Sequence, residues 1–175
     1  MRWFVDIGLV TLLAIVAFQD LKQRQISWVL LPLLLSLFLV RGSFLNSANE
    51  LIHFALFNAG FIVVQLLVLT AYMSIKNKEF SNIINSYLGL GDILFFIVIC
   101  VAFSPVNFIV FYITGLLLTL LVFVAYNLLR KKNEKEIPLA GAMAVLMISL
   151  ILLSRWSIKF NFYNDDFLTG WFINK

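Results

Sequence analysis

The sequence has little of the chemistry on which metalloproteins and disulfide-rich domains depend. Among its 175 residues there is one cysteine, Cys100, and one histidine, His53. A single cysteine excludes an intrachain disulfide and a paired CxxC metal knuckle. A single histidine argues against a His-rich metal site. We therefore expect neither a metal nor a cofactor.

Charge is also scarce. Only 13% of the residues are charged and 62% are hydrophobic, whereas a soluble domain has about 25% charged residues. A soluble core of this size could not bury so much apolar surface, so we predict an all-α integral membrane protein in a lipid bilayer. The net charge of +4 comes from short basic clusters between apolar runs. That pattern sets membrane orientation and does not indicate nucleic-acid binding.

Apolar segments follow one another along most of the chain. There are six of them, at residues 3–19, 26–40, 51–75, 92–103, 107–129 and 137–154. A spanning helix needs about 20 residues, or fewer where the bilayer thins, so we predict six transmembrane helices in one membrane domain, residues 1–154. Pro105 predicts a tight turn at 104–107, because proline blocks helix continuation. The first segment lacks a convincing cleavage site and is interpreted as a retained helix.

Residues 155–175 mix aromatic side chains with charges, and Asp165 and Asp166 interrupt them. Tryptophan and tyrosine favour the membrane–water interface. We therefore predict an interfacial C-terminal tail rather than a seventh span.

Basic residues are distributed unevenly between the two ends of the predicted spans. The loops near 20–25, 76–91 and 130–136 hold eight of the 13 lysines and arginines. The positive-inside rule places these loops in the cytoplasm and both chain termini outside it. The predicted location is the inner (cytoplasmic) membrane.

This topology brings two aspartates to one membrane face. Asp20 ends the first span and Asp92 begins the fourth, so both lie at the cytoplasmic side. An ionised aspartate within a membrane helix costs roughly 3 kcal/mol, so such a residue usually has a partner or a task. The 12 residues from Asp92 to Phe103 span about 18 Å as a helix, against a hydrocarbon core of about 30 Å. Either Asp92 or the 104–107 turn therefore lies below the membrane surface.

Two glycines, Gly89 and Gly91, stand directly before Asp92. Glycine tolerates unusual backbone angles and lets another segment approach closely. Irregular backbone at membrane depth survives only where it faces protein or a wet cavity. The pair therefore favours a recessed Asp92, whereas Asp20 could still be an ordinary helix-end carboxylate.

The remaining polar residues are assigned structural roles. Asp6 and His53 are expected to be hydrated at the interfaces, Gly141 to lie on a close-packing face, and Cys100 to be a small apolar filler. Interhelical hydrogen bonds are expected from four residues, Asn58, Gln65, Thr114 and Thr119.

Three short motifs resemble one protease family. GLGD, residues 89–92, resembles the GxGD motif of intramembrane aspartyl proteases. DLKQRQIS, residues 20–27, resembles the first aspartate motif of the type IV prepilin peptidases, in which a basic stretch and Ile-Pro-Asn follow the aspartate. EIPLAGAMA, residues 136–144, resembles the Ile-Pro segment that opens that family's last helix. Across residues 1–154 the chain resembles a minimal prepilin or preflagellin peptidase.

The resemblance implies that Asp20 and Asp92 are the catalytic pair of an endopeptidase. The supporting motif residues are Gly89, Gly91, Ile137 and Pro138. The implied substrate is a prepilin-like precursor with a basic leader and a hydrophobic helix, which is cut between the two at the cytoplasmic surface. Two nearby carboxylates that share one proton can supply the base and the acid that peptide hydrolysis needs.

Three positions depart from the family pattern. Ser27 and Trp28 stand where the family has Pro-Asn, and Leu94 stands where many members have lysine. An inactive family member is therefore one alternative, and a non-enzymatic membrane protein that uses the aspartates for protons or structure is another. A transporter would favour inverted repeats, and none is visible. Presenilin-like proteases fit less well, because their two aspartates lie on adjacent, later helices.

Overall fold

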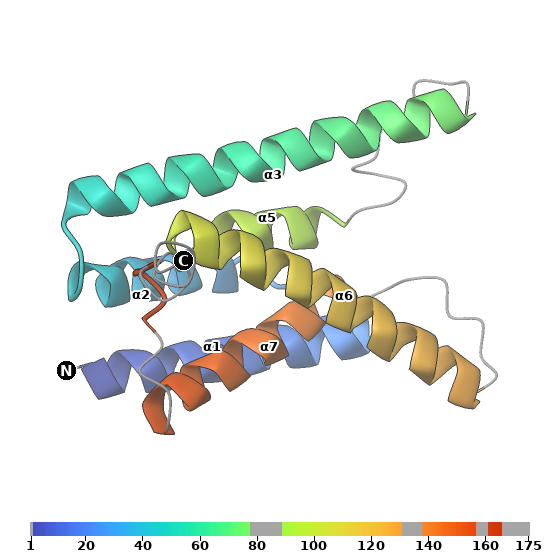
Figure 1. Ribbon diagram of the computed structural model, residues 1–175. Helices are drawn as coiled ribbons and strands as arrows, with labels where there is room; N and C mark the ends of the chain where they lie inside the picture. The colour runs from blue at the N-terminus through green and yellow to red at the C-terminus, as the bar shows by residue number, and fades with distance from the viewer. Residues whose placement is uncertain (1, 78–88, 131–137, 157–160, 166–175) are drawn as a thin grey trace, which may run out of the picture.

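The computed structural model describes residues 2–77, 89–130, 138–156 and 161–165. Within these residues the regular structure is entirely α-helical, with six helices in sequence (Figure 1). Their bounds are α1 Arg2–Gln23, α2 Leu30–Ser43, α3 Ala48–Asn77, α5 Leu90–Ile99, α6 Pro105–Arg130 and α7 Leu139–Trp156. The all-helical prediction is confirmed for this part of the chain, and each helix coincides with one predicted apolar segment.

Three of these helices are long and apolar enough to cross a membrane, namely α1, α3 and α6. The helices α2, α5 and α7 are apolar but shorter. Large hydrophobic side chains are exposed on α3 and α6, including Leu56, Val64, Leu67, Val68, Leu117, Leu121 and Val122. Contiguous apolar surface of this kind is unfavourable in water and fits a lipid bilayer.

The helices pack as a bundle in which α1 and α7 lie side by side and α3 runs along the opposite side (Figure 1). The helix α2 packs on α1, α3 and α5, and α6 contacts both α7 and α3. Fully buried side chains come from most of the helices, for example Leu13, Phe38, Phe95, Phe108 and Met143. This packing places the end of α1, the start of α5 and the start of α7 next to one another.

All three prolines lie at or just before the start of a helix. Pro32 is the third residue of α2, Pro105 is the first residue of α6, and Pro138 directly precedes α7. The first turn of a helix has N–H groups without intrahelical acceptors, so the missing proline N–H costs little there. The turn before α6 occupies residues 100–104, earlier than the predicted 104–107, because Pro105 starts the helix instead of preceding it.

The short helix α5 ends in a turn whose backbone is buried. Its 10 residues extend about 15 Å, roughly half of the hydrocarbon core. The amide of Asn58 in α3 donates hydrogen bonds to the carbonyl oxygens of Cys100 at 2.8 Å and Phe103 at 3.0 Å. These bonds satisfy polar backbone at a helix end inside the protein. Asn58 therefore makes long-range hydrogen bonds, but to the turn between α5 and α6 rather than to another helix.

The other residues expected to bond between helices behave differently. Thr114 and Thr119 donate to carbonyl groups of their own helix, to Val110 at 2.6 Å and to Gly115 at 2.7 Å. The prediction for these two threonines is wrong, because a threonine hydroxyl in a helix can reach the carbonyl one turn back. Gln65 is exposed on the surface of α3.

Replacing Asn58 by leucine should lower the free energy of unfolding by about 2–3 kcal/mol, because two buried carbonyl groups lose their donor. Thermal unfolding of purified protein in detergent, followed by circular dichroism, measures the change. Gln65→Leu is the matched control on the same helix and should leave the midpoint nearly unchanged. Equal midpoints for Asn58→Leu and the parent would contradict this role.

The described part of the C-terminal tail packs against the α5–α6 turn. The backbone N–H of Ser104 donates to the carbonyl of Phe162 at 2.9 Å. The carboxylate of Asp165 accepts hydrogen bonds from the Ser104 hydroxyl and from the Asn107 N–H. Phe162 and Tyr163 are buried. Residues 161–165 therefore cover the turn and cap the start of α6, while most of the predicted interfacial tail lies outside the described residues.

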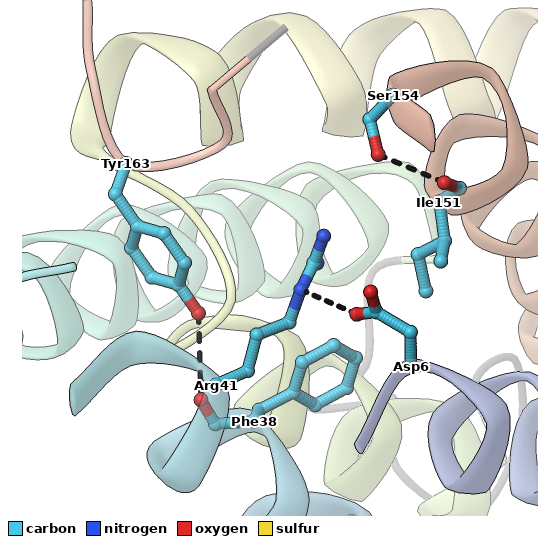
Figure 2. Close-up of polar contacts among 6 residues, drawn as sticks. All are labelled: Asp6, Phe38, Arg41, Ile151, Ser154 and Tyr163. Atoms are coloured by element: carbon cyan, nitrogen blue, oxygen red, sulfur yellow. Dashed lines mark hydrogen bonds and ion pairs between the residues drawn. The ribbon is translucent and has the colours of Figure 1, made fainter. Parts of the chain in front are cut away.

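An ion pair joins α1 to α2 near the same end of the bundle (Figure 2). Arg41 Nε lies 3.1 Å from Asp6 Oδ1, and the guanidinium stacks 4.3 Å from the centre of the Phe162 ring. The Tyr163 hydroxyl donates to the Phe38 carbonyl at 3.4 Å. Burial raises the pKa of Tyr163 to about 12, although Arg41 acts in the opposite direction, so the hydroxyl keeps its proton. The prediction of a merely hydrated Asp6 is wrong, since packing of α2 on α1 brings it a cation.

Candidate active site

Asp20 is in the last turn of α1 and is only 6% exposed. Its Oδ2 atom accepts a hydrogen bond of 2.6 Å from the backbone nitrogen of Gly141, in the first turn of α7. The missing side chain at Gly141 makes this approach possible, because a Cβ there would lie 2.9 Å from Asp20 Oδ2 and 3.3 Å from the Ala17 carbonyl oxygen. The predicted close-packing role of Gly141 is confirmed, and the group that packs on it is Asp20.

Asp92 lies in the first turn of α5 and is partly buried. Its Oδ1 atom accepts a hydrogen bond of 3.0 Å from the backbone nitrogen of Ala140. Asp92 Oδ2 also lies close to Gly89, the N-cap residue of α5, where an added Cβ would be 3.3 Å away. Asp92 is the third residue of α5, where the partial positive charge of the helix N-terminus favours a carboxylate.

The two carboxylates therefore bind neighbouring peptide groups. Ala140 and Gly141 are consecutive, and consecutive Cα atoms are about 3.8 Å apart, so Asp20 and Asp92 converge on one turn of α7. The charge of Asp20 acts on Asp92. The N-terminus of a helix carries partial positive charge and N–H groups without intrahelical acceptors, which favour negative groups there.

This arrangement can hold one proton between two carboxyl groups. Two carboxylates at close range disfavour simultaneous ionisation, so one of them tends to keep a proton. Ala140 donates to Asp92 and Gly141 donates to Asp20, so each N–H favours the ionised form of the carboxyl that it binds. A protonated and an ionised carboxyl in one place can act together as a general acid and a general base.

The glycines of the GLGD motif act through space rather than through backbone conformation. No described glycine has a positive φ angle, and Gly89 has φ −68° and ψ 139°. The unusual backbone angles that glycine tolerates are therefore not adopted by Gly89 or Gly91. The Ile26 side chain packs against Gly91, where an added Cβ would lie 3.4 Å from it, an ordinary van der Waals distance.

The segment after Asp20 is held close to α5 through Ile26. Ser27, one of the departures from the family pattern, donates its backbone N–H to Gln19 Oε1 at 2.9 Å. Trp28 is exposed, and Leu94 is exposed on α5. Proline, which the family has in place of Ser27, has no N–H and could not donate this hydrogen bond.

The Ile-Pro motif is described in part. Pro138 precedes α7, and its carbonyl oxygen accepts a hydrogen bond from the Ala142 N–H at 3.2 Å. Ile137 lies outside the described residues. Pro138 thus stands directly before α7, and the N–H groups of Ala140 and Gly141 in the first turn of that helix bind the two aspartates.

Sequence reasoning missed the donors at the centre of the site, the N–H groups of Ala140 and Gly141. The small residues in LAGAMA were the available signal, because only small side chains let a second helix come so close. Sequence reasoning counted Arg24 among the basic residues of the 20–25 loop but missed its backbone conformation. Arg24 has φ 56° and donates its N–H to the Asp20 carbonyl at 3.0 Å. This left-handed residue ends α1 in the position that glycine usually takes and brings a cation whose charge acts on Asp20.

Among the described residues, no three His, Cys, Asp or Glu side chains gather in a way that could hold a metal ion. His53 is exposed on α3, and Cys100 is buried in the α5–α6 turn as predicted. No protein-family model matches the sequence, and no curated protein or solved structure matches it. The function must be inferred from the residues and their geometry.

Proposed function

We propose that this chain is a membrane-embedded aspartyl endopeptidase that removes basic leader peptides from prepilin-like precursors at the cytoplasmic membrane face. The observation that carries the proposal is the convergence of Asp20 and Asp92 on adjacent N–H groups of α7. One carboxylate would suffice to cap this helix. A second one at the same turn adds repulsion unless the two share a proton, and such a pair suits peptide hydrolysis.

The reaction follows from the shared proton. The ionised carboxylate takes a proton from water while the water oxygen attacks the peptide carbonyl carbon, and the protonated carboxyl donates to the carbonyl oxygen. As the tetrahedral intermediate collapses, the C–N bond breaks and one carboxyl gives its proton to the leaving amine. The other, ionised carboxylate takes the proton of one hydroxyl as the carbonyl re-forms, which restores the pair with one shared proton. The Ala140 and Gly141 N–H groups keep both carboxyl groups in place throughout.

The choice of substrate comes from the motif resemblance, and the membrane arrangement is part of the proposal. The shorter helices α2, α5 and α7 cross the membrane together with the three long ones, and both chain termini lie outside the cytoplasm. The turn at the end of α5 is recessed from the outer surface, where Asn58 and residues 161–165 supply its polar partners. Asp92 then lies at the cytoplasmic surface of the inner membrane beside Asp20.

Single cysteines at the two ends of α2 should label from opposite sides of the membrane. Ser27 lies three residues before α2 and Ser43 is its last residue, and both are exposed. Replacing either serine by cysteine should therefore disturb the fold little. A membrane-impermeant maleimide applied to intact cells should label Ser43→Cys and should reach Ser27→Cys only after lysis. The native Cys100 is buried and provides the unlabelled background. External labelling of Ser27→Cys would contradict the orientation.

Purified protein in bicelles should cut a prepilin-like peptide between its basic leader and its apolar helix, and should leave the new N-terminus unmethylated. In the family that the chain resembles, methylating members carry a cytoplasmic loop with paired CxxC motifs after the first span. Here only six residues, 24–29, separate α1 from α2, and the chain has one cysteine.

Mass spectrometry of the product, with labelled S-adenosylmethionine present, tests both the cleavage and the absence of methylation. An intact substrate would favour the non-enzymatic or inactive alternatives. A cleaved product carrying a labelled methyl group would contradict only the second claim.

A further inference from the structure

A cavity of about 500 Å³ opens beside the aspartate pair, between the end of α1, the second half of α6 and the start of α7. Its wall includes Lys22, Arg24 and Tyr126, together with the apolar side chains of Leu21, Val122 and Phe123. Neither Asp20 nor Asp92 is among the described residues that line it. The cavity is therefore a neighbour of the candidate active site rather than a part of it.

The polar side of the cavity is cationic. Lys22 and Arg24 both line it, and no aspartate or glutamate is found among its described lining residues. Arg24 is kept at this place by the left-handed turn that ends α1, in which its N–H bonds to the Asp20 carbonyl at 3.0 Å. A basic leader peptide would be repelled here, so the charge complementarity favours an anion.

The other side of the cavity is apolar and faces outward. Val122 and Leu21 belong to the exposed hydrophobic surface of α6 and α1, which a bilayer would cover. A ligand that fits both sides has an anionic head and hydrocarbon chains. Basic pockets between membrane helices bind the headgroups of anionic lipids in this way.

We propose that this cavity binds the headgroup of an anionic phospholipid. Lys22 and Arg24 bind the phosphate, Tyr126 forms part of the cavity wall, and the acyl chains run along Val122 and Leu21. The site goes beyond the proposed peptidase function and does not depend on it, because its ligand and readout are separate from cleavage, although the charge of Arg24 also acts on Asp20.

Native mass spectrometry of the full-length protein, released from detergent with added phosphatidylglycerol or phosphatidylcholine, tests the site. The parent protein should retain phosphatidylglycerol in preference to phosphatidylcholine. Lys22→Gln should weaken phosphatidylglycerol retention about fivefold, and the double variant Lys22→Gln/Arg24→Gln about 25-fold. Lys76→Gln is the matched control, since Lys22 and Lys76 each lie in the last turn of a helix, and it should retain the lipid as the parent does.

A second pair of variants tests the cavity without changing its charge. Val122→Trp fills the space, whereas Val68→Trp places the same ring on α3, and the two valines are 66% and 64% exposed. Retention should fall only for Val122→Trp, with helicity by circular dichroism unchanged in both. Parental retention in Val122→Trp and in the double charge variant would overturn the proposal, and so would equal losses in the control variants. Displacement of the lipid by millimolar glycerol phosphate or inorganic phosphate would overturn it in favour of a free phosphate ligand.

Discussion

Asp20→Asn and Asp92→Asn should each lower the rate of leader cleavage by at least about 10³-fold, while the protein still inserts and accumulates. The amide has nearly the size of the carboxyl group. Its oxygen can still accept the hydrogen bond from Gly141 or Ala140, so the start of α7 stays capped. It cannot share a proton or act as the base, so the pair is disabled from either side. Single-turnover cleavage by purified variants measures the loss.

Asp165→Asn is the matched control for this experiment. Asp165 also caps a helix, since it accepts hydrogen bonds from Ser104 and Asn107 at the start of α6. The Asp165→Asn variant should cleave the substrate at the parental rate. Near-parental cleavage by Asp92→Asn would contradict the assignment of the pair. Equal losses in all three variants would contradict an acid–base role that is specific to Asp20 and Asp92. Asp6→Asn is a poorer control, because it removes the partner of Arg41.

Gly141→Ala should reduce cleavage by about 10²-fold, because the added Cβ would lie 2.9 Å from Asp20 Oδ2 and 3.1 Å from Asp20 Cβ. These contacts are too short, so α7 must shift away from α1 or Asp20 must leave the Gly141 N–H. A displacement of about 1 Å in a catalytic group costs about this factor. The same assay measures it, and thermal unfolding shows whether the fold survives.

Gly60→Ala is the control for the second experiment. Gly60 is also a helical glycine, in α3, and a Cβ there meets no atom within 4 Å. Because alanine is the better helix former, this variant should be as active and at least as stable as the parent. An active Gly141→Ala protein would contradict the requirement for close contact between Asp20 and α7.

The amino-acid sequence by itself determined the class of protein and the positions of its helices. Scarce charge and long apolar segments favour a bilayer environment, and each proline marks a helix start through its missing N–H. Span order alone placed Asp20 and Asp92 at one end of the bundle. These features depend on composition and on local backbone chemistry, which neighbouring residues decide. The helix ends were less certain, as the turn at residues 100–104 shows.

Only the tertiary structure decided what each polar group meets. The bond from Gly141 to Asp20 joins residues 121 positions apart, and the Asp6–Arg41 pair depends on how α2 packs on α1. In a soluble helix, the apolar stripe would reveal which face is buried. In a bilayer, the surface facing lipid is as apolar as the surface facing protein, so the pattern does not distinguish them. The donors of α7 and the packing of residues 161–165 could therefore emerge only from the folded chain.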